Sequence, residues 1–595
     1  MSSLELGLIG NSRTSALIDR NARIVWWCYP YFDSDPVCCE LMNPGLKDKA
    51  SGFIDVGFEK IRQADQYYER NSAVLVTRFG DNAHNVIEII DFAPCFPMHD
   101  RLFTPSSIIR IIRRVAGRPR ITIRIRPGVN YGSEAPQVLP GAHHISYKGP
   151  QQTLRVTTDA SITSILDEKP FFLNDSVTLV FGPDQAVESA PQDIGRAWYE
   201  ATVRYWQNWI HNISMPFEWQ DAVIRAAITL RMNTFYDTGA IIAAVTTSIP
   251  GSPAARHNRD YRYSWVRDSY FVVSALNRLG ATGTMERYLQ YILNIIADSK
   301  GLPFQPVYGI HRNAELEERI APALAGYNGK GPVRIGNSAC REIQNDVYGS
   351  AILACTQAFF DKRLHRPADR NVFADLERLG EEAIARYNQP DADIWHREDG
   401  KHVHTFSSVM CWAACDRLAA IAKELKMKAR EELWAANAAK IRDDILTNAY
   451  NGELGTFTSV WNGSEVDASL LLMAELRFLE PEDERFRNTV FTIEKRLLRG
   501  DFLLRYENED SDGLPETALL VCTFWWILAL AYIGETDRAR AGFEKILSRR
   551  NRLGLLSADV SREGNELWGN FPQTYSMVGL IQCALRLSRP WENAF

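Results

Sequence analysis

The sequence has no block of Lys or Arg and no long stretch of one charge. Its 67 basic and 73 acidic residues are interspersed and give a formal net charge of −6. Proteins that bind nucleic acid usually carry a basic patch or stripe, so nucleic acid is not an expected partner. Apolar residues make up 46% and charged residues 24% of the chain, a globular composition that argues against extended disorder.

Long apolar segments are also missing. The most apolar run, ALLVCTFWWILALAYIG at 518–534, is shorter than the roughly 20 residues that a membrane-spanning helix needs. The first residues, MSSLELGLIGNSRTSALIDR, lack the basic start and apolar core of a secretory signal. We therefore expect a cytoplasmic protein without a membrane partner, in which 518–534 is a buried helix. The oligomeric state stays open, and a homo-oligomer is one of the options.

The ten cysteines form no Cys-x-x-Cys pair, and most of them lie in apolar runs. Cys411 and Cys415 share a helix face, but no histidine or carboxylate spacing around them suggests a metal site. We expect buried, reduced thiols, no metal and no other cofactor.

The length of 595 residues is too great for one ordinary hydrophobic core and favours two or more domains. Residues 1–190 contain short β-branched or alternating runs such as ARIVWW, SAVLVTRF and SVTLVFG, separated by Gly, Pro, Asn and Asp. Many short strands without intervening helices predict an N-terminal antiparallel β-sandwich. Residues 191–216 change to a helical period and are expected to form a linker helix.

Residues 217–595 contain about twelve helical runs. Odd-numbered runs carry charge at helical spacing, as one-sided surface helices do, whereas even-numbered runs are apolar nearly all round. Alternating outer and inner helices predict an all-α (α/α)6 barrel, so the chain is expected to be multidomain. Connections from outer to inner helices are long and rich in aromatic and charged residues. Functional loops should therefore gather on the face where the inner helices begin.

The first of these long loops, HNRDYRYSWVRDS, concentrates polar and aromatic side chains. They are Asp260, Tyr261, Arg262, Trp265, Arg267 and Asp268. Aromatic rings pack on the apolar faces of sugars, and neighbouring Arg and Asp side chains donate to and accept from adjacent hydroxyls. A salt-bridged helix start is the alternative for this stretch alone. Three more loops, GYNGKGPVRIGNSACREIQNDVYG, FLLRYENEDSDGLPETA and GLLSADVSREGNELWGNFPQTYS, should converge on the same face.

These segments resemble glycoside hydrolase family 15, which includes glucoamylases, glucodextranases and bacterial trehalase-like enzymes. The start, LIGNSRTSALIDRNARIVWWCYPYFDSDP, is similar to the trehalase-like β-domain. The segments LEERIAPALAGYNGKGPVRIGN, MCWAACDRL, VCTFWWILAL and GNFPQTYSMVGLI are similar to barrel segments of the family. The resemblance implies a small-molecule sugar or glycoside as partner, held by its non-reducing-end α-glucosyl unit. The matching sugar-binding residues are Tyr261, Trp265, Arg267, Asp268, Trp395 and Arg505.

Both catalytic positions of the family differ in this sequence. Family 15 enzymes invert the anomeric centre, with one glutamic acid that protonates the leaving oxygen and one glutamate that activates water. The acid follows the loop tryptophan, but here the pair is Trp395-His396. The base lies in a GLLSEE-like run, but here the run reads GLLSAD, and Ala558 occupies its place.

The residues at and beside these two positions differ in how well they could act as acid or base. An imidazolium can donate a proton near neutral pH, but a cation beside a developing oxocarbenium is unfavourable. Ala558 cannot accept a proton, so Asp559 is the candidate base, with His396 or Glu398 as candidate acid. Three functions stay open. They are an inverting α-glucoside hydrolase for trehalose, isomaltose or a short α-glucoside, a repurposed lyase, isomerase or cyclase, and a non-catalytic sugar-binding protein.

Two further groups of residues carry expectations. Three histidines at 396, 402 and 404 do not share one regular face, and loop-surface histidines are expected rather than a metal site. Four aromatic residues near the N-terminus are expected to pack against the barrel face and narrow the pocket against long polymers. They are Trp26, Trp27, Tyr29 and Phe32.

Overall fold

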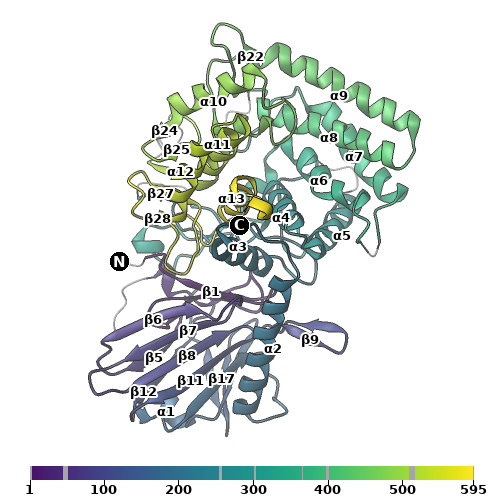
Figure 1. Cartoon of the computed structure of the whole chain (residues 1–595). Coiled ribbons are helices and arrows are strands. Elements are labelled where there is room, and N and C mark those ends of the chain that lie inside the picture. Colours follow the sequence, from purple (N-terminus) through teal and green to yellow (C-terminus); the bar gives the residue numbers. More distant parts are fainter. Residues whose placement is uncertain are drawn as a thin grey trace.

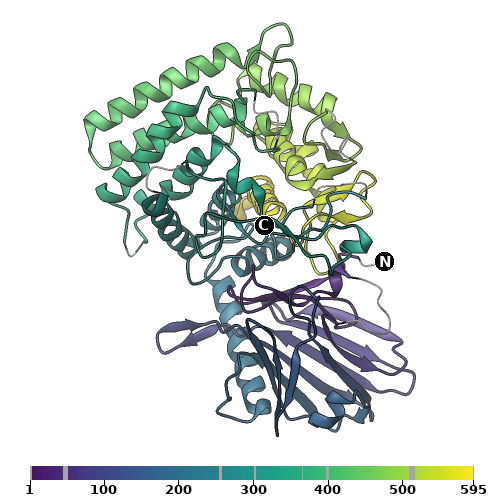
Figure 2. The same cartoon turned by 180° about the vertical axis from the view of Figure 1, so that it is seen from behind.

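The computed structural model describes residues 3–43, 51–253, 258–299, 303–364, 366–396, 401–507 and 516–593. A β-sandwich formed by the N-terminal third lies beneath a ring of helices formed by the rest of the chain (Figures 1 and 2). This arrangement confirms the predicted β-sandwich followed by a helical barrel.

Two antiparallel sheets make up the sandwich. The first has the order β1 (Gly7–Gly10), β2 (Ser15–Ile18), β3 (Ile24–Cys28), β5 (Phe53–Phe58), β12 (Arg120–Arg126) and β16 (Phe171–Phe172), with β4 (Pro36–Cys38) paired to β3. The second has the order β13 (Gln137–Pro140), β14 (His144–Lys148), β15 (Thr153–Thr158), β17 (Ser176–Gly182), β11 (Ile108–Ala116), β8 (Val86–Phe92), β7 (Leu75–Gly80) and β6 (Gln63–Tyr68). Side chains alternate along each strand, and Ile121, Ile123 and Ile125 of β12 therefore all enter the shared core.

Helix α2 (Pro191–His211) packs along the second sheet and leads into the helical domain (Figure 1). Six helices form the outer ring: α3 (Gln220–Met232), α5 (Thr282–Ser299), α7 (Arg370–Arg386), α9 (Lys428–Asn448), α10 (Glu484–Leu497) and α12 (Thr536–Leu547). The inner ring contains α4 (Val266–Arg278), α6 (Asp346–Thr356), α8 (Thr405–Glu424), the 3-10 helix η5 (Ala468–Met473), α11 (Leu520–Tyr532) and α13 (Thr574–Leu587). Each inner helix contacts the next, and α13 contacts α4, which closes the ring.

Two helices differ from the expected pattern. Helix α3, predicted as a one-sided surface helix, is buried nearly all round because the sandwich covers its outer side, where Arg225 donates to the Ser72 carbonyl (2.9 Å). The eighth helical run is only the short helix η5, and the chain leaves it through a left-handed Arg477 (φ 64°). Helix α11 is buried, as predicted, and no helix within the described ranges is long and apolar enough to cross a membrane.

The loops follow the predicted asymmetry. Connections from outer to inner helices span 233–265, 300–345, 387–404, 449–467, 498–519 and 548–573. Most connections from inner to outer helices are much shorter, such as 279–281, 425–427 and 533–535. All the long loops therefore end at the N-termini of inner helices, on one face of the ring.

The N-terminal aromatics divide between two cores. Trp26 Nε1 donates to the Val245 carbonyl (2.8 Å), and Phe32 packs edge-on against Phe235, so both face the helical domain. Trp27 and Tyr29 instead pack in the sandwich core. The prediction that all four contact the barrel is wrong for these two, because successive strand residues point to opposite faces.

The buried Asp260–Arg262 pair joins the two domains. Arg262 forms an ion pair with Asp260 (2.7 Å) and donates to the Ser34 carbonyl (3.0 Å) and the Tyr131 hydroxyl (3.1 Å). Both side chains of the ion pair are fully buried. Although they lie in the first long loop, they attach that loop to the sandwich rather than face a ligand.

Loss of the Tyr131 hydroxyl should weaken this junction. Tyr131→Phe is expected to lower the free energy of unfolding by about 1–3 kcal/mol, because a buried Arg262 N–H loses its acceptor. Denaturation followed by circular dichroism measures the change. The exposed Tyr67 provides the matched Tyr67→Phe control, and an equal effect of both substitutions would contradict the role of this bond.

Candidate functional site

Two loops meet through Arg267, which lies in the first turn of α4. Its Nη1 donates to Gln344 Oε1 and to Asp346 Oδ2, both at 2.9 Å. Burial lowers the pKa of Arg267, but Asp346, Tyr575 and Asp268 together outweigh burial, and the net effect raises the pKa. The guanidinium is thus permanently charged. Gln344, at the end of the second long loop, and Asp346, at the start of α6, hold it in place.

Asp268 is the next residue, and its carboxyl makes no hydrogen bond to another residue in the described part of the chain. Its exposed fraction is 6%, and burial raises its pKa to about 7 against the opposing charge of Arg267. A buried acceptor of this kind is stabilised by hydroxyl donors. Arg267 and Asp268 therefore offer a donor and an acceptor side by side.

Aromatic rings line the neighbouring space. Tyr261 packs edge-on against Trp265 (6.4 Å between ring centroids), and Trp265 packs edge-on against His396 (5.2 Å). Trp395 lies with Tyr506 and Trp525, and its Nε1 donates to Asp467 Oδ2 (3.1 Å). These contacts join the first, third, fourth and fifth long loops.

Asp559 begins strand β27 (Asp559–Ser561), which pairs with β26 (Thr517–Leu519) and β28 (Leu567–Trp568). Thr517 Oγ1 donates to Asp559 Oδ1 (3.3 Å). Burial raises the pKa of Asp559 to about 7, while Arg505 and the Thr517 hydrogen bond oppose this rise. Gly569 leaves room for the carboxyl, since an added Cβ there would lie 2.7 Å from Asp559 Oδ2.

The site residues share one electrostatic environment. The pKa of Tyr261 is raised chiefly by burial, and the charges of Arg259, Asp268, Asp559 and Arg505 also act on it. Arg259, Arg505 and Asp559 lie in the first, fifth and last long loops, and Asp268 lies in the first turn of α4. Tyr261 is thus close enough to both Asp268 and the candidate base Asp559 to feel their charges.

The raised pKa of Asp559 predicts a dependence of stability on pH. The folded state favours the protonated carboxyl, so its stabilising contribution is complete below the unfolded pKa of 3.8 and is lost as pH rises through about 7. Asp559→Asn keeps a neutral side chain at every pH and is expected to stabilise the protein at pH 8 by up to about 4 kcal/mol.

Urea denaturation at pH 8 and at pH 3.5 measures this difference. The gain should vanish at the lower pH, where both proteins carry a neutral group. Asp193→Asn on α2 is the matched control, because Asp193 is 65% exposed. A stabilisation that is equal at both values of pH would show that Asp559 does not titrate near neutrality.

His396 makes a short contact that the sequence did not predict. Its Nδ1 lies 2.6 Å from Glu342 Oε2, and its backbone is left-handed (φ 61°). Burial, followed by Arg259 and Arg267, lowers the pKa of His396 to about 4, although Glu342 acts in the opposite direction. Burial alone would raise the pKa of Glu342. Its pKa instead falls to about 2, because the carboxylate accepts hydrogen bonds from His396 and Gln344. The only sequence signal for Glu342 was its place in the second aromatic and charged loop.

The other two histidines of the third loop differ in burial: His402 is exposed, as predicted, whereas His404 is not. His404 is 2% exposed, and its Nδ1 and Nε2 lie 2.8 Å from Asp391 and 3.4 Å from Asp393. It is therefore a buried, paired residue, and its prediction as a surface histidine is wrong. Asp391 also accepts from the Asn345 backbone N–H (2.8 Å) and from the Ser407 hydroxyl (2.7 Å), and these hydrogen bonds compensate for the burial of its carboxylate. The candidate acid Glu398 lies outside the described residues.

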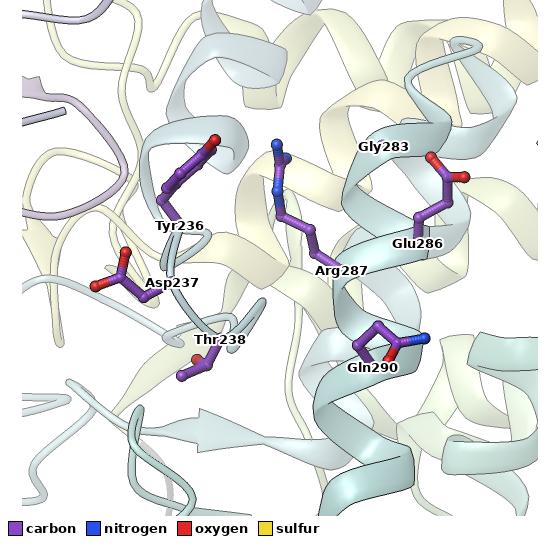
Figure 3. Close-up of a pocket in the computed structure, with 7 residues that line it drawn as sticks. All are labelled: Tyr236, Asp237, Thr238, Gly283, Glu286, Arg287 and Gln290. Atoms are coloured by element: carbon purple, nitrogen blue, oxygen red, sulfur yellow. The ribbon is translucent and has the colours of Figure 1, made fainter. Parts of the chain in front are cut away.

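The cysteines, possible metal-binding clusters and a second hollow are the remaining candidates for a functional site. All ten cysteines are buried and unpaired, as predicted. The described ranges contain no cluster of three or more His, Cys, Asp or Glu residues suited to a metal. A separate hollow lies between the end of α3 and the start of α5, where Arg287 packs over the Tyr236 ring (Figure 3). It shares no residue with the site at the inner-helix N-termini.

The chain is similar to several known proteins. Residues 219–585 match the family described as Glycosyl hydrolases family 15, and residues 3–159 match the domain described as Trehalase-like, N-terminal. A trehalase of Thermoplasma volcanium is 29% identical over 98% of this chain and 93% of its own length. A trehalase of Mycobacterium tuberculosis is 35% identical over 66% of this chain and 58% of its own length. A bacterial glucoamylase complexed with acarbose shares the fold, with a TM-score of 0.68, 14% identity, and 98% of this chain and 93% of its own covered.

Proposed function

Because this chain belongs to glycosyl hydrolase family 15, we propose that it hydrolyses a small α-glucoside with inversion, and that trehalose is its first candidate substrate. The observation that supports this most is that Asp268, Asp559 and Arg505 all lie near Tyr261, with Arg267 beside Asp268. The choice of trehalose rests on relatives that are named trehalases and that align along nearly the whole chain.

Each residue has a role in the proposed reaction. Arg267 and Asp268 hold hydroxyls of the terminal glucosyl unit, with Trp265, Tyr261 and Trp395 against its ring and Arg505 as a second sugar-binding arginine. Asp559 accepts a proton from the attacking water, and His396 gives a proton to the leaving oxygen. The carboxylate base of Asp559 replaces the base that Ala558 cannot supply.

One observation favours a second function. Near pH 7 His396 is neutral, and within the described part of the chain its ring makes hydrogen-bond contacts through Nδ1 and not through Nε2. A neutral imidazole is a base, as needed to remove a proton from carbon in a lyase or isomerase reaction. Such a reaction releases no free glucose from the sugar, which separates it from hydrolysis.

An enzyme-coupled glucose assay with trehalose, isomaltose, maltose and kojibiose tests the proposal. We expect glucose release from at least trehalose, and its loss in Arg267→Ala. Titration calorimetry of the same sugars provides the second readout. Binding without glucose release would contradict the hydrolase and support the water-free or binding-only alternatives.

A further inference from the structure

The contact between Glu342 and His396 joins two loops that lie 54 positions apart in the sequence. Glu342 belongs to the second long loop and His396 to the third. Their atoms, Oε2 and Nδ1, lie 2.6 Å apart, the distance of a charge-assisted hydrogen bond. Because the carboxylate accepts, Nδ1 carries the proton, and Nε2 is the nitrogen left for proton exchange.

Several other groups hold this pair. Gln344 Nε2 donates to Glu342 Oε2 (2.9 Å) and also lies 3.1 Å from His396 Nδ1, while Gln344 Oε1 accepts from Arg267 Nη1 (2.9 Å). Arg259 lies 3.8 Å from Glu342 Oε1, and Trp265 packs against the imidazole. The charged groups that act on His396 are thus Glu342 from the second loop, Arg259 from the first loop and Arg267 from the first turn of α4. Through Gln344, the sugar-binding arginine and the imidazole share one network.

Charge explains what this pair can do at the acid position of the family. A lone imidazolium would place a positive charge beside the developing oxocarbenium, which is unfavourable. Together with ionised Glu342, however, a protonated His396 is neutral overall, and after it donates a proton the pair carries one negative charge. A glutamic acid passes through the same two charge states. The pair therefore avoids the electrostatic penalty of a lone histidine.

We propose that the Glu342–His396 pair replaces the single carboxylic acid of the family, with His396 Nε2 as the proton donor and Glu342 as its positioning residue. This inference rests on the proposed hydrolase function. In the step, Nε2–H gives its proton to the glycosidic oxygen as the bond from that oxygen to the anomeric carbon breaks. Water forms the new bond to that carbon and gives its proton to Asp559. Glu342 stays ionised throughout.

Two variants and a matched control test the proposal. Glu342→Gln removes the charge, Glu342→Asp keeps it, and Glu318→Gln is the control. Glu318 lies in the same long loop, is paired with Arg334, and is 24% exposed, against 25% for Glu342. Nitrogen-15 NMR of the histidine rings reports the protonated nitrogen and the titration of His396 without any need for turnover. His396→Asn assigns the signal.

The proposal predicts a protonated Nδ1 in the wild type and a His396 titration that moves to lower pH in Glu342→Gln. The acidic limb of the kcat/KM profile for trehalose should move to lower pH together with the His396 titration. For each pH unit of this movement, kcat/KM should fall about tenfold. Glu342→Asp should restore part of the loss, and Glu318→Gln should change neither readout. A proton on Nε2 alone, or an unchanged titration in Glu342→Gln, would overturn the pairing.

The two proposals fail in different ways. If the wild type releases no glucose while the NMR result is as predicted, the hydrolase function and the donor role are both overturned, but the tautomer assignment stands. If glucose is released normally by Glu342→Gln, the hydrolase stands and the positioning role of Glu342 is overturned.

Discussion

Asp559→Asn is expected to lower kcat for trehalose by about 100- to 10,000-fold, the usual effect of losing a general base. Asparagine fills nearly the same volume in the space beside Gly569 but cannot take a proton from water. Sugar binding should persist, since Arg267 and Asp268 are unchanged. Steady-state glucose release gives kcat, and calorimetry with trehalose gives the affinity.

The control for this prediction is Asp193→Asn, which makes the same chemical change on the exposed surface of α2. It should leave kcat and affinity unchanged. Turnover by Asp559→Asn within about threefold of wild type would exclude Asp559 as the base, given the usual size of the effect. The same variant should be more stable than wild type at pH 8, so loss of activity through unfolding is distinguishable from loss of the base.

Arg267→Ala is expected to destabilise the protein by about 3–5 kcal/mol and to abolish measurable sugar binding. Its guanidinium is the ion-pair partner of Asp346, whose side chain is fully buried. Removal of the cation leaves that carboxylate uncompensated, and it also removes the donor that we assign to a glucose hydroxyl. Denaturation measures the first effect, and calorimetry with trehalose measures the second.

A double variant separates the loss of stability from the loss of sugar binding. Arg267→Met with Asp346→Asn removes both charges, so much of the stability should return while sugar binding stays lost. Arg196→Ala, at a position 73% exposed on α2, is the control for the loss of an arginine. Full sugar binding by the double variant would contradict the role of Arg267 as a sugar-binding residue.

The protonation states imply slow turnover. The reaction needs a protonated His396, with pKa about 4, and an ionised Asp559, with pKa about 7. Midway between these values each group is in the required state about once in thirty molecules, so roughly one molecule in a thousand is ready to react. The kcat/KM profile should therefore be a bell with a low maximum between the two values.

Much of the architecture was predictable from local patterns. Alternating runs predicted the sandwich, and helical periods with long outer-to-inner loops predicted the barrel and the face that carries the site. These features depend on residues close together in the sequence, where periodicity is informative. The (α/α)6 arrangement and the family followed from them and from the quoted motifs.

The pairs that organise the site were not predictable in this way. Glu342 and His396 are 54 positions apart, and Arg262 and Tyr131 are 131 apart, so no spacing pattern connects them. The burial of His404 is not predictable from spacing either, because it depends on how the third loop folds to bring Asp391 against it. Such contacts depend on how the loops pack, which periodicity does not describe.

The most direct test of the central claim is the anomeric form of the glucose released from trehalose. Proton NMR in the first minutes of reaction, before mutarotation, distinguishes the two anomers. Inversion with water activated by Asp559 predicts one β-glucose from the attacked unit for each α-glucose from the leaving unit. Formation of α-glucose alone would mean retention, and the absence of any glucose would mean that this site does not hydrolyse trehalose; either result would contradict the account.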